Sequence, residues 1–209
     1  MTREPLLVAA GVSATRGDRT LFRDLALDLA AGEAAQIGGP NGSGKTTLLR
    51  ILCGLGLPCS GTVQWRGVTI ARSRSRFLAE LAYIGHQPGI KEDLSALENL
   101  RLAELCGRHQ PDWLLEQALE RVGLGRLIDE PARCFSAGQR RRLALARLLV
   151  GEARLWVLDE PYTALDSEGI DLVRNLLEQH LSDGGAMVLT SHQPLELGEG
   201  RLQSIRLAA

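Results

Sequence analysis

Eight consecutive residues, Gly39–Thr46, have the composition of a loop that binds nucleotide phosphates. They lie between an apolar segment and a stretch with helical spacing, which is the context that such a loop requires. Glycines let backbone N–H groups surround a β-phosphate, and the start of the helix adds a partial positive charge. Lys45 would add charge at the β- and γ-phosphates, and the Thr46 hydroxyl would coordinate Mg²⁺. An ordinary glycine-rich turn needs neither this Lys-Thr pair nor the flanking elements, so the sequence predicts a magnesium ATP site. The predicted nucleotide contacts here are Gly39, Pro40, Asn41, Gly42, Ser43, Gly44, Lys45, Thr46 and Thr47.

A second segment, Leu155–Glu160, is apolar until it ends in two acidic residues. In proteins with this type of phosphate loop, an acid at the tip of a strand orients Mg²⁺, which is the role we expect for Asp159. Glu160 would face the γ-phosphate and position or deprotonate the attacking water. Two acids after a strand can instead cap the following helix, but their combination with Lys45 favours ATP hydrolysis.

Three further segments narrow the class of protein: Ile84–Gln87, Phe135–Gln139 and Thr190–His192. With the two motifs above, they follow the order found in the ATPase subunits of ATP-binding cassette (ABC) transporters, and the chain resembles that family along nearly its whole length. The resemblance implies an α/β fold, with a P-loop NTPase core of the ABC type, an N-terminal antiparallel β subdomain and an inserted helical subdomain. It also implies an ATPase coupled to transmembrane transport.

The resemblance assigns roles to single residues. Gln87 would contact Mg²⁺ and sense the transmembrane partner, and His192 would contact the γ-phosphate. The family signature, which grips the γ-phosphate bound to the opposite subunit, corresponds to Ser136, Ala137, Gly138 and Gln139. The segment Ala164–Asp166 would cross the dimer interface. Catalysis is thereby expected from Glu160, His192, Lys45 and Gln87, and magnesium binding from Thr46, Gln87 and Asp159.

Two positions depart from the family pattern. Ala137 stands where glycine is commoner, and its added methyl group is small enough for the phosphate contact to survive. The aromatic residue that usually stacks on adenine near the N-terminus is missing, and Thr15–Asp18 occupies its region. Arg16 could stack its planar guanidinium on the base instead, or it could be an ordinary solvated arginine.

Several segments are similar to one branch of the family, the haem-exporter ATPases of bacterial cytochrome c maturation (CcmA type). The segments that carry this similarity are Arg19–Phe22, Tyr83–Lys91, Leu97–Leu100, Phe135–Arg142, Leu155–Trp156 and Ser191–Leu195. The branch implies a homodimer of ATPase subunits, an integral-membrane permease subunit (CcmB type) and other cytochrome c maturation membrane proteins as partners. It also implies a peripheral position on the cytoplasmic face of the bacterial inner membrane.

The residues themselves give no sign of direct haem binding. There is no Cys-x-x-Cys-His motif, and Pro58-Cys59 reverses the Cys-Pro order of a typical haem-sensing motif. His86 is expected to pack or to couple Gln87 to its surroundings rather than to bind iron. His109 and His180 have no sequence neighbours that indicate a metal site. The cargo is therefore implied by the family resemblance alone.

Two other classes of function agree less well with the sequence. A soluble ABC-type protein of translation or DNA repair usually carries two cassettes or a long coiled coil, and 209 residues show neither. A P-loop kinase or GTPase would have no use for Ser136 or His192, and no guanine-reading Asn-Lys-x-Asp motif is present. One phosphate loop and one signature in a single chain complete a site only between two copies, which favours the transporter ATPase.

The elements that must position these residues follow from apolar periodicity. Short strands are expected at Leu6–Ala9, Leu25–Leu29, Ala34–Ile37, Thr62–Trp65 and Leu81–Ile84. Leu155–Leu158 and Ala186–Thr190 have the continuous apolar character of strands buried on both faces of a parallel sheet. A helix is expected over Thr46–Leu55, ending at Gly54 or Gly56.

Between Pro88 and Cys134 the pattern becomes helical. Helices are expected over Leu94–Leu105 and Pro111–Val122, with Pro111 in the first turn and Gly123 at the end. We therefore interpret 1–209 as a single ABC ATPase domain, in which 1–87 and 135–209 form the nucleotide-binding core and 88–134 form the helical subdomain.

Composition and charge limit the remaining possibilities. The apolar content is 44% and the formal net charge is −1, so nothing favours a nucleic-acid partner. The run Arg140–Arg142 is interpreted as a helix face near the nucleotide or the helical lobe. No segment reaches the ~18–20 apolar residues needed to span a bilayer. The four cysteines form no Cys-x-x-Cys pair and are expected to be reduced thiols.

Overall fold

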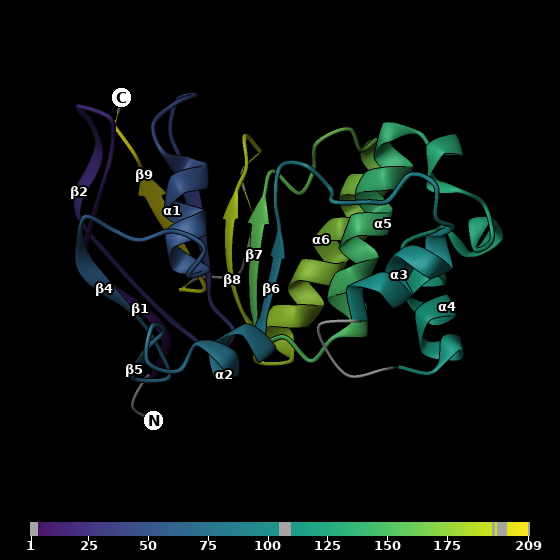
Figure 1. Ribbon diagram of the computed structural model, residues 1–209, viewed down its shortest axis with the longest axis horizontal. Coiled ribbons are helices and arrows are strands. Elements are labelled where there is room, and N and C mark those ends of the chain that lie inside the picture. The colour runs from purple at the N-terminus through teal and green to yellow at the C-terminus, as the bar shows by residue number, and fades with distance from the viewer. Residues whose placement is uncertain (1–3, 105–109, 194, 196–199, 209) are drawn as a thin grey trace.

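Two sheets of different kinds flank helix α1 (Lys45–Leu52) in the computed structural model (Figure 1). The structure describes residues 4–104, 110–193, 195 and 200–208, so Cys106, His109 and Pro194 lie outside the described residues. One sheet has the order β2-β1-β4-β5 and is antiparallel, and the other has the order β6-β7-β8-β3-β9 and is parallel. This mixed α/β arrangement confirms the predicted fold class.

The antiparallel sheet is more extensive than the apolar pattern indicates. Its strands are β1 (Pro5–Arg16), β2 (Arg19–Ala30), β4 (Ser60–Trp65) and β5 (Val68–Thr69). The pairing of β1 with β2 contains several register shifts. A bulge reverses which side chains face the core, so the alternation of apolar residues breaks although the strand continues. This explains why the expected strands Leu6–Ala9 and Leu25–Leu29 are too short.

The parallel sheet is covered on both faces. Its strands are β3 (Ala34–Gly38), β6 (Leu81–Ile84), β7 (Leu155–Asp159), β8 (Ala186–Thr190) and β9 (Leu202–Arg206). Every residue of β7 and β8 is buried, as the continuous apolar pattern predicts. Helix α1 packs on one face, and helices α5 (Ala137–Val150) and α6 (Ser167–Ser182) cover the other (Figure 1).

A third group of helices packs against α5 on the side away from the sheet (Figure 1). It consists of α3 (Ala96–Glu104), α4 (Asp112–Arg121) and the short 3₁₀ turns η1 (Gly125–Leu127) and η2 (Ala132–Cys134). Pro111 is the N-cap of α4, one residue before the helix, and Gly123 follows its C-cap at a φ of 71°. Among the described residues, no helix is long and apolar enough to cross a membrane.

Candidate functional site

The phosphate loop connects β3 to α1 at the carboxyl edge of the parallel sheet. Gly39 has a φ of 141°, and a Cβ atom there would lie 2.7 Å from the carbonyl oxygen of Leu207. Only glycine fits such a place, because the backbone conformation and the close contact both exclude a side chain. Helix α1 begins at Lys45 and has no acidic residue in its first turn. Its positive end is therefore free to attract an anion.

Lys45 lies folded over its own loop. Its ammonium group donates hydrogen bonds to the carbonyl oxygens of Gly39 (2.8 Å) and Pro40 (3.2 Å). These contacts keep the charge above the loop, where a phosphate would arrive. At the base of the loop, the hydroxyl of Ser43 is buried without a hydrogen-bond partner among the described residues. A buried unpaired hydroxyl is costly, so it is an observation in favour of a bound polar ligand.

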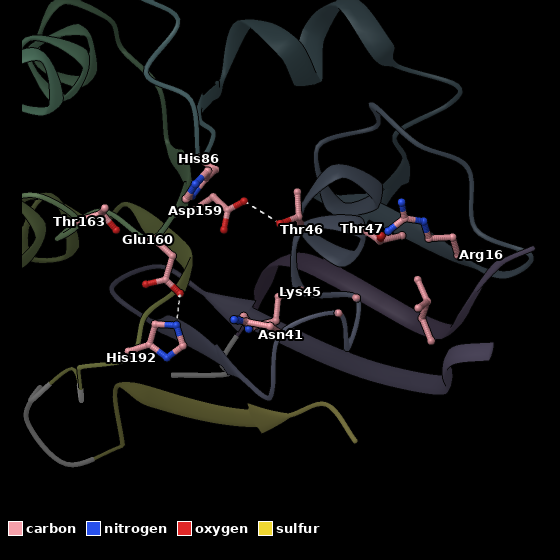
Figure 2. Close-up of a pocket in the computed structure, with 13 residues that line it drawn as sticks. Arg16, Asn41, Lys45, Thr46, Thr47, His86, Asp159, Glu160, Thr163 and His192 are labelled. Atoms are coloured by element: carbon pink, nitrogen blue, oxygen red, sulfur yellow. Dashed lines mark hydrogen bonds and ion pairs between the residues drawn. The ribbon is translucent and has the colours of Figure 1, made fainter. Parts of the chain in front are cut away.

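Asp159 lies at the end of β7 between two threonines. The Thr46 hydroxyl donates to one carboxylate oxygen over 2.9 Å, and the Thr190 hydroxyl donates to the other over 2.7 Å. Figure 2 shows Thr46 and Asp159 facing each other from α1 and β7. A hydroxyl and a carboxylate at this distance are oxygen ligands of the type that Mg²⁺ prefers, with phosphate oxygens and water completing its shell.

The backbone of Glu160 has an unusual conformation, which hydrogen bonds to its N–H and to its carbonyl hold in place. Its φ is 53°, in the left-handed region that costs free energy for a residue with a side chain. Its N–H donates to the Thr190 hydroxyl over 2.9 Å, and its carbonyl accepts from Arg141 over 2.8 Å. Its Oε1 atom is buried without a hydrogen-bond partner and lies 3.6 Å from His192 Nε2. This carboxylate oxygen is therefore available to a water molecule or a ligand.

Arg141 is a buried arginine on α5, 3% exposed. It donates to the carbonyl oxygens of Asp159 (2.6 Å), Glu160 (2.8 Å), Gly85 (3.0 Å) and Pro161 (3.3 Å). Burial lowers the pKa of its guanidinium, and the nearby charges of Asp159 and Glu160 oppose that change. The residue thus joins α5 to the backbone that carries both acids and to the strand end before Gln87.

A cavity of about 510 Å³ opens between the phosphate loop, the two acids and His192 (Figure 2). Its size is within the range of ligand sites. The sequence-predicted residues that line it are Arg16, Asn41, Gly42, Gly44, Lys45, Thr46, Thr47, Asp159, Glu160 and His192. Leu21, His86 and Thr163 also line it, and none of the three was expected from the sequence to contact the nucleotide. Gln87 is exposed beside the cavity wall that His86 forms.

The signature residues Ser136, Ala137, Gly138 and Gln139 do not line this cavity. They form the start of α5, where the Ser136 hydroxyl accepts from the Gln139 N–H and the Gln139 side chain accepts from the Ser136 N–H. This capping box leaves the exposed end of the helix ordered. Gly138 lies against the segment Ala164–Asp166, since a Cβ atom on it would approach the Ala164 carbonyl oxygen to 2.7 Å.

Two residues that the sequence did not single out are central to the geometry. Arg141 was only one member of an arginine run, and its neighbour Arg140 is part-exposed. In the sequence, Thr190 is only the residue that precedes Ser191-His192. A polar residue at the end of the apolar strand β8 is the signal that could have indicated a partner for Asp159.

These features define an ATP-binding cassette. Residues 22–163 match the family model described as ABC transporter, and the chain belongs to that family. It is 49% identical over 203 residues to a "Cytochrome c biogenesis ATP-binding export protein CcmA" of Methylococcus capsulatus, covering 97% of this chain and 98% of the relative. It is 46% identical over 202 residues to the protein of the same name in Escherichia coli K12, covering 97% and 96%.

Solved structures agree on the fold. An ATP-binding subunit of an ABC transporter matches with a TM-score of 0.80 at 25% identity, covering 90% of this chain and 79% of that chain. The ADP conformation of another ATP-binding cassette matches with a TM-score of 0.77 at 20% identity, covering 91% and 82%. The predicted family and fold are therefore confirmed.

Proposed function

We propose that this chain is the ATP-hydrolysing subunit of an export complex that serves cytochrome c biogenesis, with haem as the cargo. The observation that carries the hydrolytic part is Glu160, whose buried Oε1 atom has no hydrogen-bond partner among the described residues and lies 3.6 Å from His192 Nε2 at the cavity. A carboxylate in this place can orient or deprotonate the water that attacks the γ-phosphate. The export role is supported by the names of the relatives.

Several side chains at or beside the cavity would then take part in hydrolysis. Lys45 moves from the loop carbonyls to the β- and γ-phosphates, and His192 contacts the γ-phosphate. Thr46 and Asp159 would hold Mg²⁺, which would supply positive charge against the negative charge that develops on the phosphates. Gln87 is proposed to add a ligand from the loop beside His86. Among the described residues, no group of three or more His, Cys, Asp or Glu could hold a metal.

The site is proposed to be completed by a second copy of the chain. The signature Ser136–Gln139 does not reach the cavity of its own chain, but its helix end is exposed and suited to a phosphate. A homodimer would place it against the γ-phosphate bound to the partner. The helical subdomain 88–134 would then move with α5 on closure, relative to the core formed by 1–87 and 135–209.

Coupling to the membrane is proposed to start at Gln87. The loop after it is tied to α3 by Asn99, whose amide accepts from the Lys91 N–H (2.8 Å) and donates to the carbonyls of Lys91 (3.0 Å) and Ser95 (2.9 Å). Movement of the loop is thus transmitted to the helices. The partner is proposed to be a membrane-spanning permease of the CcmB type, which would hold the chain on the cytoplasmic face of the inner membrane.

The decisive experiment is Glu160→Gln in the full chain. With ATP and Mg²⁺ it should lose hydrolysis and accumulate as a stable dimer in light scattering. Glu152→Gln is the matched control, because Glu152 precedes the opposite end of β7 and is exposed. Normal turnover by a monomeric Glu160→Gln variant would disprove the proposal.

A second experiment tests the partner and the cargo. The chain should pellet with membranes only when its permease is co-expressed. In cells that carry Lys45→Ala, holocytochromes c should be lost and the cargo should accumulate on the side of synthesis. Unchanged holocytochrome levels would overturn the assignment to cytochrome biogenesis without affecting the ATPase assignment.

A further inference from the structure

Gln36 is a polar side chain within the central part of the parallel sheet. It lies on β3 between β8 and β9, opposite Leu189 and Ser204. Side chains alternate along a strand, so Gln36 projects on the same face as Ala34, which packs in the apolar cluster under α5 and α6. Gln36 is half-buried there, so hydrogen bonds to protein groups offset the partial loss of water around its amide.

Its partners all belong to the segment that follows β8. The Gln36 amide nitrogen donates to the Gln193 carbonyl over 2.7 Å and approaches the Ser191 carbonyl at 3.4 Å. The amide oxygen accepts from the Leu195 N–H over 3.1 Å. One side chain therefore contacts the backbone immediately before and immediately after His192.

The His192 ring depends on that backbone for its position. It is 74% exposed, and its Nε2 atom lies 3.6 Å from Glu160 Oε1. Thr190 fixes the start of the segment through Asp159, and Leu195, 4% exposed, fixes its end in the apolar cluster. Between these anchors, two side chains hold the turn that carries His192: the Ser191 hydroxyl accepts from the Gln193 N–H over 2.9 Å, and Gln36 bonds to the backbone on both sides of His192.

We propose that Gln36 is a positioning residue that sets His192 against Glu160 and the γ-phosphate. This inference rests on the proposed ATPase function and adds to it a residue that touches neither nucleotide nor metal. The chemistry requires an amide, because one group must both donate to carbonyls and accept from an N–H. A glutamate would place negative charge against two carbonyl oxygens, and a leucine would fill the space without any hydrogen bond.

The test is a double-mutant cycle on ATP hydrolysis by the full chain. Gln36→Leu should lower kcat about tenfold with KM for ATP nearly unchanged, the loss expected when hydrogen bonds that orient a catalytic group disappear. His192→Ala should lower kcat at least as much. Because Gln36 acts through His192, adding Gln36→Leu to His192→Ala should cause no further loss.

Gln203→Leu is the matched control. Gln203 is a half-buried glutamine on the neighbouring strand β9, and its amide donates to Asp28 instead of the His192 segment. It should keep wild-type kcat. Wild-type kcat in Gln36→Leu, or a full additional loss in the double variant, would overturn the inference. Failure of the proposed function would be a separate result. In that case the wild-type protein would show no ATP hydrolysis that Glu160→Gln abolishes.

Discussion

The Thr190 hydroxyl donates a 2.7 Å hydrogen bond to the Asp159 carboxylate, and both side chains are buried. The same hydroxyl accepts from the backbone N–H of Glu160. A single oxygen atom at the end of β8 thus orients the proposed magnesium ligand and the neighbouring proposed base. The other Asp159 oxygen accepts from Thr46, so the carboxylate is held on both sides before any ligand arrives.

Thr190→Val should therefore impair both stability and hydrolysis. Valine has nearly the same shape but leaves a carboxylate oxygen and an N–H buried without a partner, at a cost of about 1–3 kcal/mol. We expect a lower urea midpoint and a kcat lowered at least tenfold. Thr190→Ser keeps the hydroxyl and should restore most of the activity. Equal activity of the valine and serine variants would show that the hydrogen bonds are unimportant.

Arg141→Met should destabilise the protein by about 3 kcal/mol, because it leaves several buried carbonyl oxygens without a donor. The measurement is denaturant unfolding at neutral pH. Arg140→Met is the control: the same substitution one residue away, at a part-exposed position, should change stability by less than about 0.5 kcal/mol. If the two variants unfold at the same denaturant concentration, Arg141 does not hold the backbone of the two acids.

His180 should make the fold sensitive to acid. It is buried, stacks on Trp156 with ring centroids 3.8 Å apart, and its Nε2 lies 3.2 Å from the Ala186 carbonyl. Burial lowers its pKa from 6.5 to about 4, although the Ala186 hydrogen bond opposes this. The folded state thus binds a proton less readily than the unfolded state.

Above pH 6.5 the imidazole is neutral in both states and does not oppose folding. As pH falls towards 4, the unfolded state binds a proton that the folded state does not, so the free energy of unfolding decreases by about 3 kcal/mol in total. His180→Phe keeps a ring on Trp156 and cannot titrate. Its free energy of unfolding should start lower at pH 7.5 and fall less between pH 6.5 and 4. Parallel curves for the two proteins would contradict the prediction.

Arg16 lines the cavity at the end of β1, and we predict that it stacks on the adenine. Arg16→Ala should weaken ATP binding about fivefold, as expected for about 1 kcal/mol of cation–π interaction. Binding of inorganic triphosphate should not change, because that ligand has no base. Arg19→Ala is the control, because Arg19 stands opposite Arg16 across the hairpin of β1 and β2 and does not line the cavity. A loss of affinity for triphosphate would indicate a phosphate contact instead, and unchanged ATP affinity would exclude any role.

Features encoded by contiguous residues could be predicted from the sequence. The phosphate loop and the buried strands β7 and β8 are local patterns, and the structure confirms β8 over Ala186–Thr190 without change. The expected helix Thr46–Leu55 ends earlier, at Leu52, because Gly54 adopts a φ of 67° just beyond its C-cap. Helix α2 (Arg74–Ala79) is short and arginine-rich, so apolar periodicity gave no sign of it.

Features that depend on distant contacts could not be predicted. Gln36 and Gln193 are separated by 157 positions in the sequence, and nothing local to either indicates that they meet. The role of Arg141 could not be predicted for the same reason, because its partner Gly85 follows β6 and its partner Asp159 ends β7. The role of Gln87 stays a prediction, because its neighbour His86 lines the cavity and Gln87 does not.

The close contact of Gly138 with the Ala164 carbonyl has a consequence for the timing of a catalytic cycle. A larger residue at position 138 would push the Ala164–Asp166 segment away, so the glycine sets the spacing between the signature and this segment. In the proposed homodimer, the signature that would contact one nucleotide would therefore lie against the segment that is expected to cross the interface. Hydrolysis and release at the two nucleotide sites would then be expected to be coupled. A variant that separates the two segments should weaken this coupling.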